Sequence, residues 1–242
     1  ILALILFIYL AKLAKKMKLV KLKSSSFSKK IRNTAKIKLL IIHYTGMQSM
    51  RVAIARLVAK KNKVSTHYLI GRDGKIVQMV EDNRIAWHAG KSKWGKFVNL
   101  NDKSIGIELV NKGHKYGYQK FSRKQVNSLI KLCAQLKRKY KIKNRFILGH
   151  SDIAPLRKVD PGEKFPWILL KKRKIGIWHS LRNQNTLSKS KKLNKKNFRD
   201  VFFKNLYKIG YRYFLKEEPL STDKLIIKSF QRRFRQKKVD GK

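Results

Sequence analysis

The residues of this sequence that could bind a metal ion are its six histidines, its 13 carboxylates and its single cysteine. His43 and His150 each follow a short apolar run that is typical of a buried strand, and strand ends in an α/β sheet collect at one edge. Asp160 lies shortly after His150, beside Pro161, where a turn can return its carboxylate to that edge. Two imidazoles and one carboxylate, with a fourth position left to water, suit a hydrolytic zinc site. Spacing alone is weak evidence, because a single strand-end histidine is more often a hydrogen-bonded structural residue.

The elements that must position these residues alternate along the chain. Continuous apolar runs, typical of strands buried on both faces, lie at 38–43, 104–110 and 145–149. Apolar residues at helical spacing predict one helix from Ser49 to Lys60 and another from Ser122 to about Tyr140. Strands interleaved with helices indicate an α/β or α+β domain that spans residues 37–178.

Two further segments of this domain have no helical pattern. Strand-like runs on either side of the Gly-Arg-Asp-Gly sequence at 71–74 predict a hairpin. Residues 81–103 contain two tryptophans but no periodicity, and we interpret them as a long loop, which in a compact domain is usually functional or disordered.

Both ends of the chain differ from this central part. Residues 1–36 are a lead-in that we expect to be irregular; the apolar run at 1–11 and the lysines after it suit a signal or anchor, or a non-native extension upstream of Met17. The polar stretch at 183–196 predicts a linker. Two amphipathic segments at 197–242 predict a small α-helical domain that is cut off, since two helices cannot close a core alone.

The charge of the chain is its most unusual bulk property. Sixty-one Lys and Arg against 13 Asp and Glu give a net charge of +48, a field that attracts nucleic acid, anionic lipid or anionic cell-wall polymers. The cations are spread over the whole length, which favours a compositional bias on solvated faces. No interleaved aromatic pattern accompanies them, so we expect no specific nucleic acid partner. Cys133 lies on the apolar face of the second predicted helix and is expected in the core.

Several blocks of the central part stand in an order that resembles a known family. The blocks are IIHYTG at 41–46, VSTHYLI at 64–70, AWHAG at 86–90, SIGIELV at 104–110, GHSDIAP at 149–155 and KVDPG at 158–162. Over roughly residues 37–170 they are similar to the type-2 N-acetylmuramoyl-L-alanine amidases, which are related to phage amidase-lysozymes and animal peptidoglycan recognition proteins. Several ordered blocks together make an accidental match improbable.

The resemblance implies a site and a reaction. The zinc ligands of the family fall on His43, His150 and Asp160, its active-site carboxylate on Glu108 and its catalytic lysine on Lys158. The implied fold is a central mixed β-sheet with helices on both sides. One Zn²⁺ per chain would then support hydrolysis of the amide between N-acetylmuramic acid and L-alanine in peptidoglycan or muropeptides. Because all of these positions are filled, a non-catalytic peptidoglycan-binding protein is the alternative rather than the first hypothesis.

Other expectations concern the surroundings of this site and the tail. Trp87, His88 and His67 are candidates for substrate contact, with packing roles as the alternative, and His67 in particular is expected to be buried near the metal. Residues 225–241 resemble the helical peptidoglycan-binding domain of wall hydrolases, whose third helix is missing here. We expect a monomer. The compartment stays open, with the cell envelope or periplasm favoured over the cytoplasm, and so does the choice between intact wall and anhydro-muropeptide.

Overall fold

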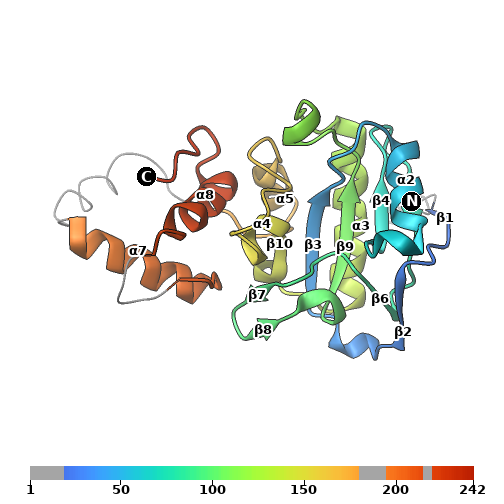
Figure 1. Cartoon of the computed structure of the whole chain (residues 1–242), viewed down its shortest axis with the longest axis horizontal. Coiled ribbons are helices and arrows are strands. Elements are labelled where there is room, and N and C mark those ends of the chain that lie inside the picture. The colour runs from blue at the N-terminus through green and yellow to red at the C-terminus, as the bar shows by residue number, and fades with distance from the viewer. Residues whose placement is uncertain (1–18, 180–194, 215–219) are drawn as a thin grey trace, which may run out of the picture.

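A six-stranded mixed sheet forms the centre of the computed structural model, which describes residues 19–179, 195–214 and 220–242 (Figure 1). Its strand order is β1 (Leu19–Lys21), β5 (Ile76–Gln78), β4 (Tyr68–Ile70), β9 (Ser104–Leu109), β3 (Leu39–Tyr44) and β10 (Ile147–Gly149). Strands β4, β9, β3 and β10 run parallel, whereas β5 is antiparallel to β4 and parallel to β1. The predicted mixed sheet is therefore confirmed, as is the hairpin, which is formed by β4 and β5.

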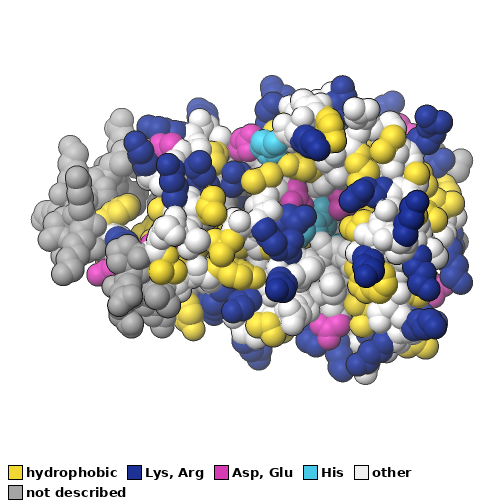
Figure 2. Space-filling view, viewed as in Figure 1, with side chains coloured by type: hydrophobic (Ala, Val, Ile, Leu, Met, Phe, Trp, Pro, Cys, Tyr) yellow, Lys and Arg dark blue, Asp and Glu magenta, His cyan; other side chains and the backbone are white. Residues whose placement is uncertain are grey.

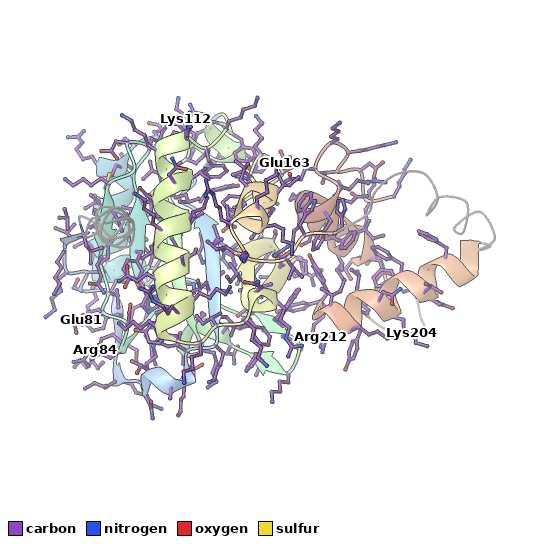
Figure 3. All side chains as sticks on the ribbon, turned by 180° about the vertical axis from the view of Figure 1, so that it is seen from behind. Glu81, Arg84, Lys112, Glu163, Lys204 and Arg212 are labelled. Carbon is purple, nitrogen blue, oxygen red and sulfur yellow. The ribbon has the colours of Figure 1, made fainter. Side chains whose placement is uncertain are left out.

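The central strands are apolar on both faces because both faces are covered. Alternate residues of β3 enter two different core clusters. Leu40 and Ile42 pack with helix α3 (Arg123–Lys139). Leu39 and Ile41 pack with residues of the 89–100 loop and of the C-terminal segment, which comprises the described residues 195–214 and 220–242. Figure 3, seen from behind, shows α3 lying along the sheet. Burial on both sides explains the continuous apolar runs of the sequence.

The helices begin where their capping residues predict. Ser49 accepts a hydrogen bond from the Val52 amide at the start of α2 (Met50–Val58), and Ser122 accepts one from the Gln125 amide at the start of α3. The described part of the chain also contains the helices α4 (His150–Ile153), α5 (Trp167–Lys172), α7 (Lys195–Ile209) and α8 (Asp223–Phe234). Short 3₁₀ helices lie at Thr34–Lys36, Lys60–Asn62, Leu100–Asp102, His114–Tyr116 and Asn144–Phe146. As predicted, Cys133 is buried, on the face of α3 that packs into the core.

The lead-in was expected to be irregular, but its described part, residues 19–36, contains two strands and a 3₁₀ helix. Strand β1 pairs with β5, and β2 (Phe27–Ile31) pairs with β6 (Arg84–Ala86). The long loop at 81–103 contains β6 and a small hairpin of β7 (Lys93–Trp94) and β8 (Phe97–Val98). Arg32 fixes the lead-in to that loop, because its guanidinium donates hydrogen bonds to the carbonyls of Asp82, Asn101 and Ser104. Three-residue strands and one buried arginine leave no periodic signal in a sequence.

The two C-terminal helices pack on the rest of the chain. Phe203, Leu206, Tyr211 and Ile226 are buried in the same core cluster as Leu39 of the central sheet. These residues therefore pack against the central sheet as well as against each other. Most of the predicted linker at 183–196, and the apolar run at 1–11, lie outside the described residues. Within the ranges that the structure describes, no helix is long and apolar enough to cross a membrane.

Candidate metal centre and active site

Three side chains from separate parts of the sequence converge at one end of the parallel strands. His43 lies near the end of β3, and His150 is the first residue of α4, directly after β10. Because β3 and β10 are parallel neighbours, in register at Ile42 and Gly149, the next residue of each strand reaches the same edge. His43 Nδ1 lies 2.9 Å from His150 Nδ1, and each is 3.1 Å from Asp160 Oδ2. This is the one candidate metal-binding group found among the described residues.

Hydrogen bonds on the far side of each ring fix which nitrogen faces the cluster. The Ala89 carbonyl lies 3.2 Å from His150 Nε2 and can only accept, so Nε2 carries the proton and Nδ1 a lone pair. Ser104 Oγ donates to the Leu100 carbonyl and therefore accepts from His88 Nε2, at 3.2 Å. His88 Nδ1 then accepts from His43 Nε2, at 3.0 Å.

The outcome is a donor set that suits a divalent cation. Both Nδ1 atoms present lone pairs to each other and to a carboxylate oxygen, an arrangement that is repulsive unless a positive charge lies between them. Two imidazole nitrogens and one carboxylate oxygen are ligands that Zn²⁺ accepts, and bonding of the far ring nitrogen is the usual way to orient a ligating histidine. The residues present therefore fit zinc.

The electrostatics of His43 and Asp160 agree with this. Burial, together with the neighbouring His150, lowers the pKa of His43 to about 4, so its ring is neutral near pH 7. Burial alone would raise the pKa of Asp160, but the two histidines hold it far below its ordinary value, so the carboxylate is ionised. Neutral imidazole and ionised carboxylate are the protonation states that bind metal.

Glu108 and Lys158 line the same hollow, which has a volume of about 330 Å³. Glu108 lies on β9 directly across from His43, in parallel register. Its Oε2 atom is shielded from solvent and has no hydrogen-bond partner within the described part of the chain. Burial and the Asp160 carboxylate raise the pKa of Glu108 to about 8, although Lys158 opposes the shift. An unpartnered carboxyl with a pKa near neutrality, beside a metal-ligand cluster, is suited to proton transfer.

The three residues considered for substrate contact occupy different environments. His88 lines the hollow but is buried, and it holds His43 as described above. Trp87 is half-buried and lines a shallow hollow with Lys60 and Lys63. His67 is fully buried: Nδ1 accepts from the Gly106 amide, and Nε2 lies 2.8 Å from the Arg32 guanidinium. The expected burial of His67 is confirmed, and it leaves the ring no surface for a substrate.

Sequence reasoning missed two groups beside the site. Arg157 donates to the carbonyls of Ala89 and Lys91, which holds the loop whose Ala89 carbonyl orients His150. At the rim, the Tyr44 hydroxyl donates to His114 Nδ1 at 2.9 Å, and His114 Nε2 lies 3.2 Å from the Glu163 carboxylate. No local pattern separates one arginine of this basic chain from the rest.

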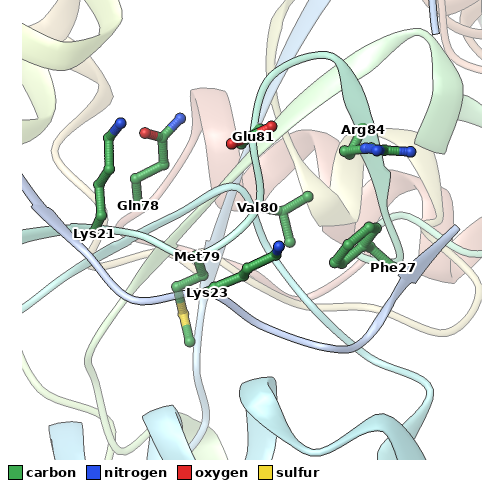
Figure 4. A pocket seen from close by; sticks show the side chains of 8 residues that line it. All are labelled: Lys21, Lys23, Phe27, Gln78, Met79, Val80, Glu81 and Arg84. Carbon is green, nitrogen blue, oxygen red and sulfur yellow. The ribbon is translucent and has the colours of Figure 1, made fainter. Parts of the chain in front are cut away.

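Figure 2 shows imidazole and carboxylate side chains near the middle of one face, with Lys and Arg on all sides of them. A second hollow, of about 200 Å³, lies at the β1–β5 edge of the sheet and is lined by Lys21, Lys23, Phe27, Gln78, Met79, Val80, Glu81 and Arg84 (Figure 4). None of the residues of the His43–His150–Asp160 cluster lines it. The chemistry is therefore expected at the hollow that contains His43.

A comparison with protein families matches residues 33–163 to the N-acetylmuramoyl-L-alanine amidases. The chain belongs to this family. The similarity drawn from the sequence blocks is thus confirmed. Within the family, the chain is 40% identical over 163 residues to the N-acetylmuramoyl-L-alanine amidase AmiD of Escherichia coli K12, a match that covers 62% of this chain and 58% of AmiD. It is 43% identical over 106 residues to the 1,6-anhydro-N-acetylmuramyl-L-alanine amidase AmpD of Haemophilus influenzae, a match that covers 43% of this chain and 55% of AmpD.

Solved structures of the family extend the likeness beyond the matched residues. A complex of E. coli AmiD with anhydro-N-acetylmuramic acid-L-Ala-D-γ-Glu-L-Lys superposes with a TM-score of 0.73 at 30% identity, covering 88% of this chain and 86% of that one. AmpDh3 of Pseudomonas aeruginosa gives a TM-score of 0.76 at 27% identity, and the superposition covers 90% of this chain and 91% of AmpDh3. The matched part of this amidase-family chain spans a little more than half the length of the two curated relatives, AmiD and AmpD.

Proposed function

We propose that this protein is a zinc-dependent amidase that hydrolyses the amide between the lactyl group of N-acetylmuramic acid and L-alanine of the stem peptide. The observation that carries the proposal is the meeting of His43, His150 and Asp160 in one hollow with Glu108, whose Oε2 has no hydrogen-bond partner among the described residues. Membership of the amidase family supports the choice of bond.

His43, His150 and Asp160 would hold the zinc ion. When bound there, zinc supplies Lewis-acid polarisation of the amide carbonyl and makes water acidic enough to act as a nucleophile near neutral pH. His88 and the Ala89 carbonyl keep the two imidazoles in the required tautomer. Asp160 contributes a negative charge, which its low pKa maintains over the physiological range.

Glu108 would move the proton in this reaction. It accepts a proton from the attacking water as the oxygen–carbon bond forms, and it passes that proton to the nitrogen as the carbon–nitrogen bond breaks. The products are the free lactyl carboxylic acid of the sugar and a peptide with a free L-alanine amine. Lys158, which lines the same hollow, would stabilise the negative charge that develops on the carbonyl oxygen.

We propose muropeptides with an anhydro sugar as substrates. AmpD relatives carry that sugar in their names, and AmiD has been solved with an anhydro-muropeptide. Tyr44, which lines the hollow, and half-buried Trp87, which directly precedes His88 in the chain, offer apolar ring surface to a sugar.

The test is release of peptide from defined substrates. The zinc-loaded protein is incubated with anhydro-N-acetylmuramyl tripeptide and, separately, with intact wall, and free peptide is measured by mass spectrometry. We expect release from the first substrate, loss of release after chelation and recovery on adding zinc. His150→Ala is the inactive variant, and Lys131→Ala, on the exposed face of α3, is the matched surface control. Stoichiometric zinc without peptide release from either substrate would refute the amidase and leave a binding protein.

A further inference from the structure

The C-terminal segment contacts the short helix that begins at the candidate metal ligand His150. Asp152, two residues further on, is 1% exposed, and its Oδ1 accepts a hydrogen bond from the Tyr211 hydroxyl at 2.6 Å. Its Oδ2 accepts from Arg233 Nη1 at 2.5 Å, in an ion pair whose side chains are both nearly inaccessible. The negative charge of Asp152, which is buried in the amidase fold, is thus balanced by Arg233 of α8.

Further bonds join the same two segments. Arg233 Nη2 donates to the carbonyl of Ile147 at 3.0 Å, and the guanidinium lies 4.0 Å from the ring centroid of Trp167. Ser229 Oγ, which is fully buried, donates to the Ser151 carbonyl at 2.7 Å. Figure 1 shows α8 lying next to α4 and β10. The stretch 147–152 is therefore held by the C-terminal segment at main-chain and side-chain atoms.

Hydrogen bonds connect these contacts to two of the three candidate metal ligands, His150 and Asp160. Asp152 Oδ2 also accepts from the Gly149 amide at 2.8 Å, which fixes the main chain one residue before His150. On the other side, the Ser151 amide donates to the Asp160 carbonyl at 2.8 Å. A shift of α4 would therefore move both His150 and Asp160 relative to His43, which lies on the neighbouring strand.

We propose that Arg233 and Tyr211 are positioning residues for the metal site, and that the C-terminal helices are part of the amidase unit rather than a separable wall-binding appendage. A buried ion pair adds little net stability compared with apolar residues of the same size, but its directional bonds select one arrangement of the groups that it joins. Here the selected arrangement is that of α4. The inference rests on the proposed metal site, and not on the bond that the site cleaves.

The chain provides a matched control for this idea. Arg199 of α7 pairs with Asp223 of α8 at 2.7 Å, a second, partly shielded Arg–Asp pair, which joins the two C-terminal helices to each other. Arg233→Met and Arg199→Met therefore make the same chemical change in the same segment. Tyr211→Phe removes a single hydroxyl, and Arg233→Lys keeps the charge but loses the fork that reaches Ile147.

The experiment measures zinc affinity by competition with a chromogenic chelator, at a temperature where circular dichroism shows each full-length variant folded. Loss of an outer contact to a metal site commonly weakens metal binding about 10- to 100-fold. We expect at least a tenfold loss in Arg233→Met, a smaller loss in Tyr211→Phe, partial rescue in Arg233→Lys and no change in Arg199→Met. The visible spectrum of the cobalt-substituted protein should change in the first two variants alone.

Unchanged zinc affinity and cobalt spectra in both Arg233→Met and Tyr211→Phe would overturn the proposal, as would an equal loss in Arg199→Met. If Arg233→Met does not fold, Tyr211→Phe alone decides the matter. The readouts need no substrate. A wild-type protein that releases no peptide would refute the amidase, whereas the metal affinities of the variants would still decide the positioning role.

Discussion

Replacement of Glu108 by glutamine should have opposite effects on activity and on stability. Glutamine keeps the size and shape of the side chain but cannot accept and return a proton. Because Oε2 has no hydrogen-bond partner within the described residues, the change breaks no bond that holds the site together. The zinc ligands are not altered, so the variant should bind zinc with the affinity of the wild type.

The expected loss of activity follows from the proposed role. General acid–base catalysis by a positioned side chain contributes roughly 10²- to 10⁴-fold, so kcat/KM should fall by about that factor in Glu108→Gln. Lys158 stays in place, so residual activity above the uncatalysed rate is expected.

The expected gain in stability follows from the raised pKa. The folded, metal-free protein binds a proton at Glu108 with a pKa of about 8, against an ordinary value of 4.5, so the folded state is protonated where the unfolded state is ionised. Between these values the free energy of unfolding falls as the pH rises, because the unfolded state binds fewer protons. At pH 7 this penalty is about 3 kcal/mol, and glutamine removes it.

The assay combines urea denaturation of the metal-free proteins at pH 5, 7 and 8 with steady-state kinetics of the zinc-loaded proteins. The stability difference between variant and wild type should grow from under about 1 kcal/mol at pH 5 to about 4 kcal/mol at pH 8. Metal-free protein is needed because a bound cation would itself favour the carboxylate. A difference that does not change with pH would refute the assignment of a high pKa to Glu108. A kcat/KM within about tenfold of wild type would refute its role in proton transfer.

Four further predictions concern other residues. His150→Ala should lose stoichiometric zinc, measured by metal analysis after dialysis, while circular dichroism shows the fold retained. Lys158→Met should lower kcat/KM about 10²- to 10³-fold in kinetic assays with zinc affinity unchanged. Arg32→Met should lower the free energy of unfolding in urea by about 3 kcal/mol or more, because it leaves buried carbonyls unpaired. Burial opposes ionisation of Asp82, but hydrogen bonds from two tyrosines and a lysine lower its pKa. Asp82 therefore stabilises the fold at pH values above its unfolded pKa, and this stabilisation is lost as the pH falls. In Asp82→Asn, the free energy of unfolding measured in urea should depend less on pH in the acid range.

Much of the fold could be predicted because its signals are local. The strands β3 and β9 are buried on both faces and appear as continuous apolar runs, and the serines at 49 and 122 mark helix starts by their capping hydrogen bonds. The ordered sequence blocks indicated His43, His150 and Asp160 as a set, which spacing alone could not do. The structure brings these three side chains together.

The lead-in and the tail could not be predicted in the same way. A three-residue strand such as β1 is too short to show periodicity, and it is stabilised by β5, which lies far away in the sequence. The tail was expected to be a partial helical domain, and no local pattern indicated that Phe203, Leu206 and Ile226 are buried in the same cluster as strand β3. Such packing depends on the shape of the partner surface, which no local pattern encodes.

The sequence by itself therefore determined the kinds of groups available for chemistry and the elements that carry them, because residue type and apolar spacing act over a few neighbouring residues. Only the tertiary structure decided which polar groups meet. The pairing of Arg233 with Asp152 and the bond from His88 to His43 join distant residues, and a single arginine among 61 basic residues has no distinguishing neighbours. These contacts exist because a buried polar group without a partner costs free energy, and the packing of the whole chain decides which partner is within reach.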